Sequence, residues 1–160
     1  MQVIKDWKII QDHWVHLADE PITNDGFITV SIARWKTERS DLISRNGELG
    51  LRVTADDNLE EIADDLEHFQ IIALDFPAFT DGRCFSYARL LRNRYQFSGE
   101  IRAIGAFIRD QIFFLSRVGV DSFEFKNPIN LNEALKAAKD FTVCYQTSSD
   151  EREPYLFHGA

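Results

Sequence analysis

The stretch "IIALDFPAFTDGRCFSYARLLRNRYQFSGEIRAIG", residues 71–105, predicts a strand, a helix and a second strand in direct succession. The apolar runs at 71–76 and 100–105 have the length and composition of buried strands. Between them a helix is expected over 83–95, and the Ser98–Gly99 pair marks the turn that follows it. Parallel strands need such a crossover, which a helix usually supplies. This stretch therefore predicts a parallel β-sheet with helices packed against it.

The alternation of strands and helices continues upstream and downstream of this stretch. Strands are expected at 50–54, 122–126 and 141–146. Further helices are expected to begin at Asn58 and Asn130, because each has a glutamate three residues later, as in a capping box. Another helix is expected over 110–118, with Gly119 just beyond its end, where a left-handed residue is wanted.

These elements predict an α/β fold with a mostly parallel sheet of about five strands, either open or curved into a partial barrel. The β-α repeats occupy 47–146. Residues 1–46 contain the strand-like runs WKII, HWVHL and FITVSIARW, and we expect them to form an antiparallel β extension that is too small to fold alone. A single domain is therefore expected over 1–146, followed by a polar, flexible tail at 147–160.

Composition and charge exclude several classes of function. The 160 residues carry a net charge of -8, which disfavours binding to nucleic acids or anionic membranes. The first residues lack the apolar run of a signal peptide, and no apolar run is long enough to span a bilayer, so a cytoplasmic protein is expected. Cys84 and Cys144 lie outside any metal-binding cluster, and no G-x-G spacing is present, so we predict neither a metal site nor a bound cofactor.

Seven arginines between residues 83 and 117 stand against only two acidic residues, Glu100 and Asp110. Arg89, Arg92 and Arg94 fall within the helix predicted over 83–95, where an exposed basic face is ordinary. Arg83 and Arg109 stand just before predicted helices, after the ends of predicted strands. The sequence therefore predicts two populations of arginine, one that solvates helix surfaces and one that could hold an anion.

Ligands of open α/β sheets bind at the carboxyl ends of the strands. This rule brings Asp75, Asp81, Arg83, Arg109 and Asp110 to one edge of the predicted sheet. The planar guanidinium group of arginine suits an oxyanion, because it donates paired hydrogen bonds and keeps its charge. The alternative for each of these residues is a salt bridge that only supports the fold. The predicted site consists of an anion-binding set, Arg83, Arg102, Arg109 and Gln111, and two candidate catalytic acids, Asp75 and Asp110.

Asp75 ends an apolar strand, a position that is often catalytic or metal-binding in α/β folds. It could also cap the following turn. A phosphoacceptor role, with Lys126 as the partnering lysine of a receiver-like domain, is disfavoured for two reasons. Only one helix separates Asp75 from the acidic pair Asp56–Asp57, and Gly105 and Ala106 stand where a switch hydroxyl is needed.

The runs "GRCFSYARLLRNRY", "GEIRAIG", "IRDQ" and "SRVGVDSFEF" resemble a bacterial family of uncharacterised proteins that are commonly encoded beside assimilatory sulfite reductase. Its members are often labelled probable oxidoreductases of sulfite reduction. The likeness is specific over about 79–125, and "LGLRVTADD" and "GFITVSIARW" add weaker support upstream. Two positions depart from the family pattern. Ala106 stands where an acidic residue is frequent, and Val120 stands where phenylalanine is frequent.

The resemblance implies a protein of sulfate and sulfite assimilation, and sulfite and sulfate are themselves small oxyanions. It implies either an oxidoreductase or an accessory factor that uses the cofactors of the reductase, because two unpaired cysteines cannot ligate an iron–sulfur cluster. The alternative is a non-catalytic interaction module, in which the arginine-rich strip binds sulfite reductase or a second copy of the chain.

Overall fold

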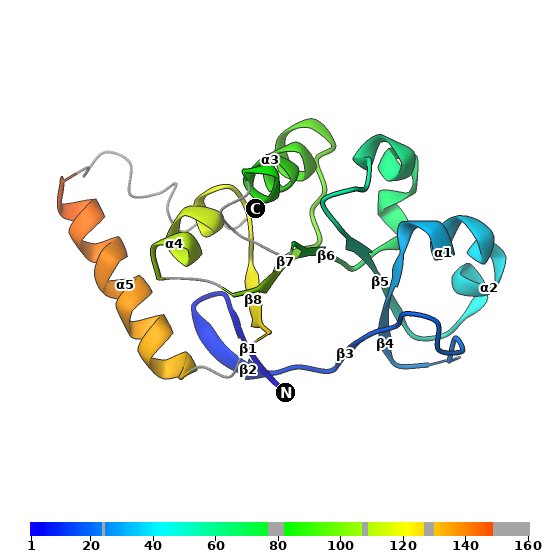
Figure 1. Ribbon diagram of the computed structural model, residues 1–160, viewed down its shortest axis with the longest axis horizontal. Coiled ribbons are helices and arrows are strands. Elements are labelled where there is room, and N and C mark those ends of the chain that lie inside the picture. The colour runs from blue at the N-terminus through cyan, green and yellow to red at the C-terminus, as the bar shows by residue number, and fades with distance from the viewer. Residues whose placement is uncertain (24, 77–81, 107–108, 127–129, 149–160) are drawn as a thin grey trace.

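A computed structural model describes residues 1–23, 25–76, 82–106, 109–126 and 130–148, without the side chains of Arg109 and of residues 141–148. Within these residues, eight strands form one sheet with helices on its outer side (Figure 1). The strands are β1 (Gln2–Lys5), β2 (Lys8–Gln11), β3 (Trp14–His16), β4 (Phe27–Ser31), β5 (Glu48–Val53), β6 (Ile71–Asp75), β7 (Glu100–Gly105) and β8 (Ser122–Phe125). The helices are α1 (Ile32–Thr37), α2 (Arg39–Ser44), the 3₁₀-helix η1 (Leu59–His68), α3 (Arg83–Arg89), the π-helical turn η2 (Leu90–Arg94), α4 (Arg109–Arg117) and α5 (Leu131–Ser148).

The strand order β2-β1-β8-β7-β6-β5-β4-β3 forces the sheet to curl. Strands β2 and β3 lie at opposite edges, yet only Asp12 and His13 separate them in sequence. Two linking residues span at most about 10 Å between the flanking Cα atoms. The outer strands of a flat eight-stranded sheet would be about 33 Å apart. The sheet is therefore a curled half-barrel, and the linker crosses its open side below the sheet in Figure 1.

The two faces of the sheet differ in polarity because side chains alternate along each strand. The convex face carries the apolar residues that pack under the helices, among them Leu51, Leu74, Ala103 and Phe123, all buried. The concave face carries the residues between them. The strand register places Arg52, Ala73, Arg102 and Ser122 in one row across this face.

Four of the five predicted parallel strands are confirmed as β5, β6, β7 and β8, and the predicted helix over 83–95 is confirmed as α3 and η2. The prediction of five strands is too small, since the sheet has eight. The antiparallel extension is correct only for β1 and β2, because β3 and β4 pair in parallel with the rest of the sheet. The run FITVSIARW is not one strand. Ser31 ends β4, and its hydroxyl accepts a hydrogen bond from the Arg34 N–H, which starts α1.

The strand predicted at 141–146 is helical and belongs to α5. The reason lies in the edge of the sheet that a strand after β8 would have joined. There, β1 already pairs with β8, and Ile4 lies opposite Phe123. No glycine or proline interrupts the helix after Ala138, so the chain continues as helix. The tail predicted at 147–160 lies, apart from its first two residues, outside the described residues.

Arg92 is not one of the exposed helix arginines that the sequence predicts. Its side chain is 7% exposed, and it donates hydrogen bonds to the carbonyl groups of Phe97, Gly99 and Gly119 and to the carboxylate of Asp121. A Cβ atom at Gly119, where φ is +108°, would lie 2.4 Å from the Arg92 Cγ atom. Arg92 therefore fastens η2 to the segments that enter β7 and β8.

A second buried arginine, Arg102, holds the concave face of the half-barrel together. Its side chain is 1% exposed and donates from Nε to Ser122, from Nη1 to Glu124, and from Nη2 to both Asp12 and Glu100. Glu124 also accepts from His16 Nε2 at 3.0 Å, with the proton on that nitrogen. Asp12 belongs to the linker and His16 to β3, so these bonds tie the segment across the open side to the inner wall.

Two carboxylates of this network, Glu100 and Glu124, have pKa values below their ordinary value in the folded protein. Burial alone would raise the pKa of Glu124, but the hydrogen bond from His16 and the charges of His16 and Arg102 outweigh it and hold the pKa below its ordinary value. The pKa of Glu100 is also lowered, because its bonds with Lys5 and Ser122 and the charge of Arg102 outweigh the effect of burial. Within the described residues, one oxygen of the network, Oδ2 of Asp12, is buried without a hydrogen-bond donor.

Replacing Arg92 with methionine should lower the free energy of unfolding by about 3 kcal/mol, because the change removes the donor of three carbonyl groups and leaves the Asp121 carboxylate with the Ile101 N–H but without its cation. The measurement is urea unfolding followed by circular dichroism. The matched control is Lys139→Met, which removes an exposed cation from α5 and should change the free energy by less than about 0.5 kcal/mol. Equal effects of the two substitutions would show that Arg92 contributes no more than a surface charge.

Acid should weaken the concave-face network in a way that depends on Glu124. A carboxyl group whose pKa is lower in the folded state binds fewer protons there, so it adds stability above its unfolded pKa, about 4.3, and loses this contribution as the pH falls further. We expect Glu124→Gln to destabilise the protein at pH 7, and the difference from wild type to shrink below about pH 4. Urea unfolding across this pH range measures both free energies. Glu60→Gln, at an exposed position, should instead run parallel to wild type, and a Glu124→Gln curve that also ran parallel would contradict the prediction.

None of the described helices combines the length and the apolar character that crossing a lipid bilayer requires.

Candidate functional site

The carboxyl ends of six parallel strands, β3 to β8, gather at one end of the half-barrel. This is the end at which barrels of β-α units carry their ligands, because the loops that follow the strands meet there. The described residues at this end include Ser31, Thr54, Asp75, Gly105 and Lys126. Asp81 and residues 107–108 and 127–129 lie outside the described residues, so the prediction for Asp81 stays untested.

Asp75 and Lys126 form an ion pair at this end of the sheet. The Lys126 Nζ atom lies 2.5 Å from Asp75 Oδ1, and the side chains are 48% and 21% exposed, respectively. Asp75 ends β6 and Lys126 follows β8, so the pair passes over the end of β7, whose Gly105 carbonyl accepts the Lys126 N–H. The pair thus joins three neighbouring strands while staying in contact with solvent.

Arg52 is a second cation near this end, one residue before β5 ends. It lies on the concave face, in register with Ser31 of β4 and Ala73 of β6. Asp75 is two residues beyond Ala73 on the neighbouring strand, so its Cα lies about 8 Å from that of Arg52. Arg52 is half-buried, and its guanidinium makes no hydrogen bond or ion pair in the described structure.

The pKa of Glu20 shows one place at which the charge of Arg52 acts. Glu20 belongs to the loop that follows β3, and hydrogen bonds from the backbone N–H groups of Glu20 and Ala18 lower its pKa. The nearby charges of Arg34 and Arg52 lower it further. The charge of Arg52 therefore acts at the carboxyl end of β3. Arg52 and Lys126 are thus two cations at the same end of the half-barrel. Asp75 ends β6, which is next to the β5 strand of Arg52 and is separated by β7 from β8, the strand that Lys126 follows.

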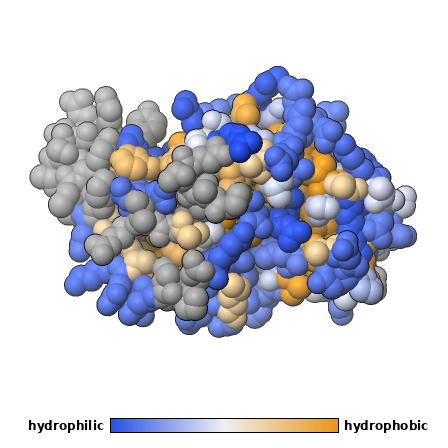
Figure 2. Space-filling model, in the orientation of Figure 1, coloured by the Kyte–Doolittle hydropathy of each residue, from blue (hydrophilic) through white to orange (hydrophobic). Residues whose placement is uncertain are grey.

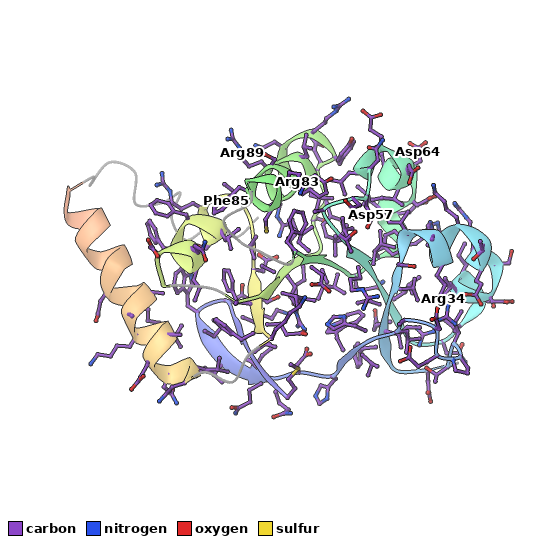
Figure 3. All side chains as sticks on the ribbon, viewed as in Figure 1. Arg34, Asp57, Asp64, Arg83, Phe85 and Arg89 are labelled. Atoms are coloured by element: carbon purple, nitrogen blue, oxygen red, sulfur yellow. The ribbon has the colours of Figure 1, made fainter. Side chains whose placement is uncertain are left out.

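Arg83 reaches the loop after β5 from the first residue of α3. Its Nη1 atom donates to the Ala55 carbonyl at 3.1 Å. Tyr87, one turn later, donates its hydroxyl to the carbonyl groups of Ala55 and Asp57. Figure 3 shows Arg83 on α3 beside the loop that holds Asp57. Arg83 therefore lies at the predicted end of the sheet, and part of its hydrogen-bonding capacity is used to hold α3 against that loop.

The other predicted site residues are separated from this group. Arg102 occupies the middle of β7, where its N–H groups bond to Asp12, Glu100, Glu124 and Ser122, so it supports the fold as the salt-bridge alternative expected. Asp110 is exposed in the first turn of α4. Gln111 is half-buried beside it, and the side chain of Arg109 lies outside the described residues.

Sequence reasoning missed Arg52 as a site residue and considered Lys126 only as part of a receiver-like pattern. A signal for Arg52 was present, because Leu49, Leu51 and Val53 alternate with Gly50 and Arg52. A period of two puts the arginine on the opposite face from the apolar residues. No such signal pairs Lys126 with Asp75, which are 51 positions apart and meet only because β6 and β8 flank β7.

The donor set at this end of the sheet is suited to a small anion. Two cationic side chains supply hydrogen-bond donors, and one carboxylate supplies an acceptor. No cluster of three or more His, Cys, Asp and Glu side chains that could hold a metal ion occurs in the described part of the chain. Hydrophilic residues predominate on the surface over α3 and η1, the upper rim of the molecule in Figure 2.

Comparison with known proteins identifies one family. The family model described as "Bacterial protein of unknown function (DUF934)" matches residues 50–156, about two thirds of the chain. No curated protein and no solved structure is significantly similar. The matched segment begins in β5 and contains Arg52, Asp75, Arg83 and Lys126. The chain therefore belongs to the bacterial DUF934 family.

Proposed function

We propose that this chain is a protein of sulfite reduction that binds a small, singly protonated oxyanion at the carboxyl end of its half-barrel. The observation that carries the proposal is Arg52, a half-buried guanidinium without an ion pair or hydrogen bond in the described structure, on the strand next to that of Asp75. A half-buried cation without a hydrogen bond or ion pair is unusual, because within the described residues only longer-range attraction, such as that of Glu20, offsets the cost of its desolvation. A bound anion would offset the cost of desolvating Arg52.

The carboxylate of Asp75 limits which anion fits. A fully deprotonated oxyanion such as sulfate has only acceptor oxygens and would be repelled by Asp75. Hydrogen sulfite and hydrogen phosphate each carry one proton that an Asp75 oxygen can accept while Arg52 and Lys126 donate to the other oxygens. The Asp75–Lys126 ion pair holds the carboxylate in place for this role. The site therefore favours sulfite, which is partly protonated near neutral pH, over sulfate.

Several residues flank this core of the proposed site. The helices that follow β6 and β7 carry Arg83 on α3 and Arg109 and Gln111 on α4. We propose that these residues bind the anion directly or line the path by which it enters. Asp110 in the same turn of α4 is a second candidate for proton transfer. Arg102 has no place in the proposal, since its donors are directed at the carboxylates of the inner wall.

The assignment to sulfite reduction rests on the resemblance of residues 79–125 to proteins encoded beside sulfite reductase. The anion site fits either role that the resemblance implies. An oxidoreductase would use Asp75 or Asp110 to move a proton to the bound oxyanion. An accessory factor would hold sulfite for the reductase, which would then supply the electron-transfer cofactors. The second role requires no redox group within this chain.

Binding should raise the melting temperature selectively. At a hundredfold excess of ligand over its dissociation constant, one site adds about 2.7 kcal/mol to the free energy of unfolding, which corresponds to about 5–10 °C for a chain of this size. We expect this shift with sulfite, and a smaller one with sulfate or chloride at matched ionic strength. Arg52→Met and Lys126→Met should abolish it, whereas Lys8→Met, an exposed cation on β2, should not. Equal shifts with sulfite and chloride would refute a specific site.

Asp75→Asn tests the role of the proton on the ligand. Asparagine has nearly the same shape but can donate a hydrogen bond and carries no charge. The variant should therefore bind sulfate at least as well as sulfite, reversing the order found for the wild-type protein in the same thermal-shift series. A variant that kept the preference for sulfite would contradict the role proposed for Asp75 and leave the cationic pair as the only determinant.

The link to sulfite reduction can be tested in a bacterium that carries the gene. Deletion should impair growth on sulfate as the only sulfur source, and growth on cysteine should be unaffected. A plasmid with the Arg52→Met variant should fail to restore growth, whereas one with Lys8→Met should restore it. Normal growth of the deletion strain on sulfate would refute the role in assimilation, even if the purified protein binds sulfite.

A further inference from the structure

Two neighbouring helices present opposite charges to solvent on the convex side of the sheet. The basic strip consists of Arg89 and Arg94, at the ends of α3 and η2, and both are exposed. The acidic strip consists of the four exposed carboxylates of η1: Glu60, Glu61, Asp64 and Glu67. In Figure 3, Arg89 and Asp64 extend outward from adjacent helices at the same rim of the molecule.

The backbone of η2 accounts for the alignment of the two arginines. Five residues complete about one turn of a π-helix but about 1.4 turns of an α-helix. The Tyr95 N–H bonds to the Leu90 carbonyl, five residues back, as a π-helical turn requires. Arg89 and Arg94 therefore lie near the same face, whereas a regular α-helix would separate them widely. Between them, Arg92 turns inward to its carbonyl partners, so the turn places one arginine inside and two outside.

Within the described residues, the strips are only partly neutralised. Arg89 makes no ion pair with any described residue, and Arg94 contacts only the ring of Tyr95, with its guanidinium carbon 5.6 Å from the ring centre. Glu60 and Asp64 also lack ion pairs in the described structure, whereas Glu61 pairs with Lys36, and Glu67 lies 3.8 Å from His68. Both signs of charge are therefore available to a partner. Phe85, one turn before Arg89, is partly exposed and adds an aromatic group beside the basic strip.

Two adjacent strips of opposite sign form a self-complementary surface. A two-fold axis between them places the basic strip of one copy on the acidic strip of the other, and the reverse contact forms at the same time. A polyanion is attracted by two arginines but repelled by four neighbouring carboxylates and by a net charge of -8. A polycation is repelled by the arginines. A suitable partner must present both signs in the opposite order, and a second copy does so by symmetry.

We propose that the chain forms a two-fold symmetric dimer in which Arg89 and Arg94 of each copy contact the acidic strip on η1 of the other. The anion site lies at the carboxyl ends of the strands and shares no residue with this surface, so the dimer does not depend on the proposed function. Pairing of exposed charges weakens as salt screens it. The dimer should therefore dissociate at high ionic strength.

Sedimentation velocity of the full chain at low salt tests the dimer through exchanged charges. Arg89→Glu/Arg94→Glu should raise the dissociation constant at least about tenfold, because it turns attraction into repulsion, and so should Glu60→Lys/Asp64→Lys, because it cancels the net charge of the acidic strip. An equimolar mixture of the two variants should associate again, since the glutamates introduced in one variant then face the lysines introduced in the other. The exposed positions allow both variants to fold, which circular dichroism verifies.

The matched control is Lys136→Glu/Lys139→Glu on α5, which changes the net charge by the same amount as the arginine variant and should leave the dimer intact. Three results would each overturn the proposal. These are a monomeric wild-type protein at low salt, variants that dimerise as well as wild type, and a mixture of the two variants that remains monomeric. The last result would show that loss of dimer came from charge in general and not from contact between the strips.

Discussion

The ion pairs between Arg102 and three carboxylates are the constraint on which the half-barrel depends. Arg102 is attached to β7, Glu124 to β8 and Asp12 to the linker that crosses the open side of the sheet. A buried ion network of this kind adds little net stability, because desolvation of the charges cancels most of their attraction. Its effect is on geometry. If the linker and β3 moved away from the wall, Arg102 would lose its bond to Asp12 and Glu124 would lose its bond to His16, which is more costly than the native arrangement.

This constraint also explains why the concave face is polar. A closed sheet of eight strands usually fills its interior with side chains, most of them apolar. Here the half-barrel is closed on one side by a short extended segment instead of by further strands and helices. Its inner wall carries Arg102, Glu100, Glu124, Ser122 and Thr29, and the segment supplies Asp12 and His16 to match them. Specific hydrogen bonds fix the position of the segment, where apolar contacts would allow it to slide.

The arginines of this chain divide by what they contact, not by where they stand in the sequence. Arg45, Arg92 and Arg102 are buried or nearly so and bond to carbonyl groups or carboxylates of distant segments. Arg52, Arg89 and Arg94 have no ion pair in the described structure. The hydrogen-bond donors of the first group are directed at other parts of the fold. The second group leaves charge for a ligand or a partner, and its members lie on two separate surfaces, so the proposed anion binding and the proposed self-association would be independent of each other.

The sequence by itself determined the β-α alternation from β5 to β8 and the caps at Asn58 and Asn130. These features follow from local periodicity and from side chains that bond to the nearest backbone, so a short window contains their cause. Asp75 at the end of a strand was found in the same way. Only the tertiary structure decided the strand order, the helical state of residues 141–146, the burial of Arg92 and Arg102, and the meeting of Asp75 with Lys126. Each of these depends on which strand occupies which edge of the sheet. The pairing of β1 with β8 removes the place for a later strand, and the return of the linker to β4 curls the sheet and selects the residues that line its interior. Such pairings join segments up to about 120 residues apart and leave no mark on the local pattern of either segment.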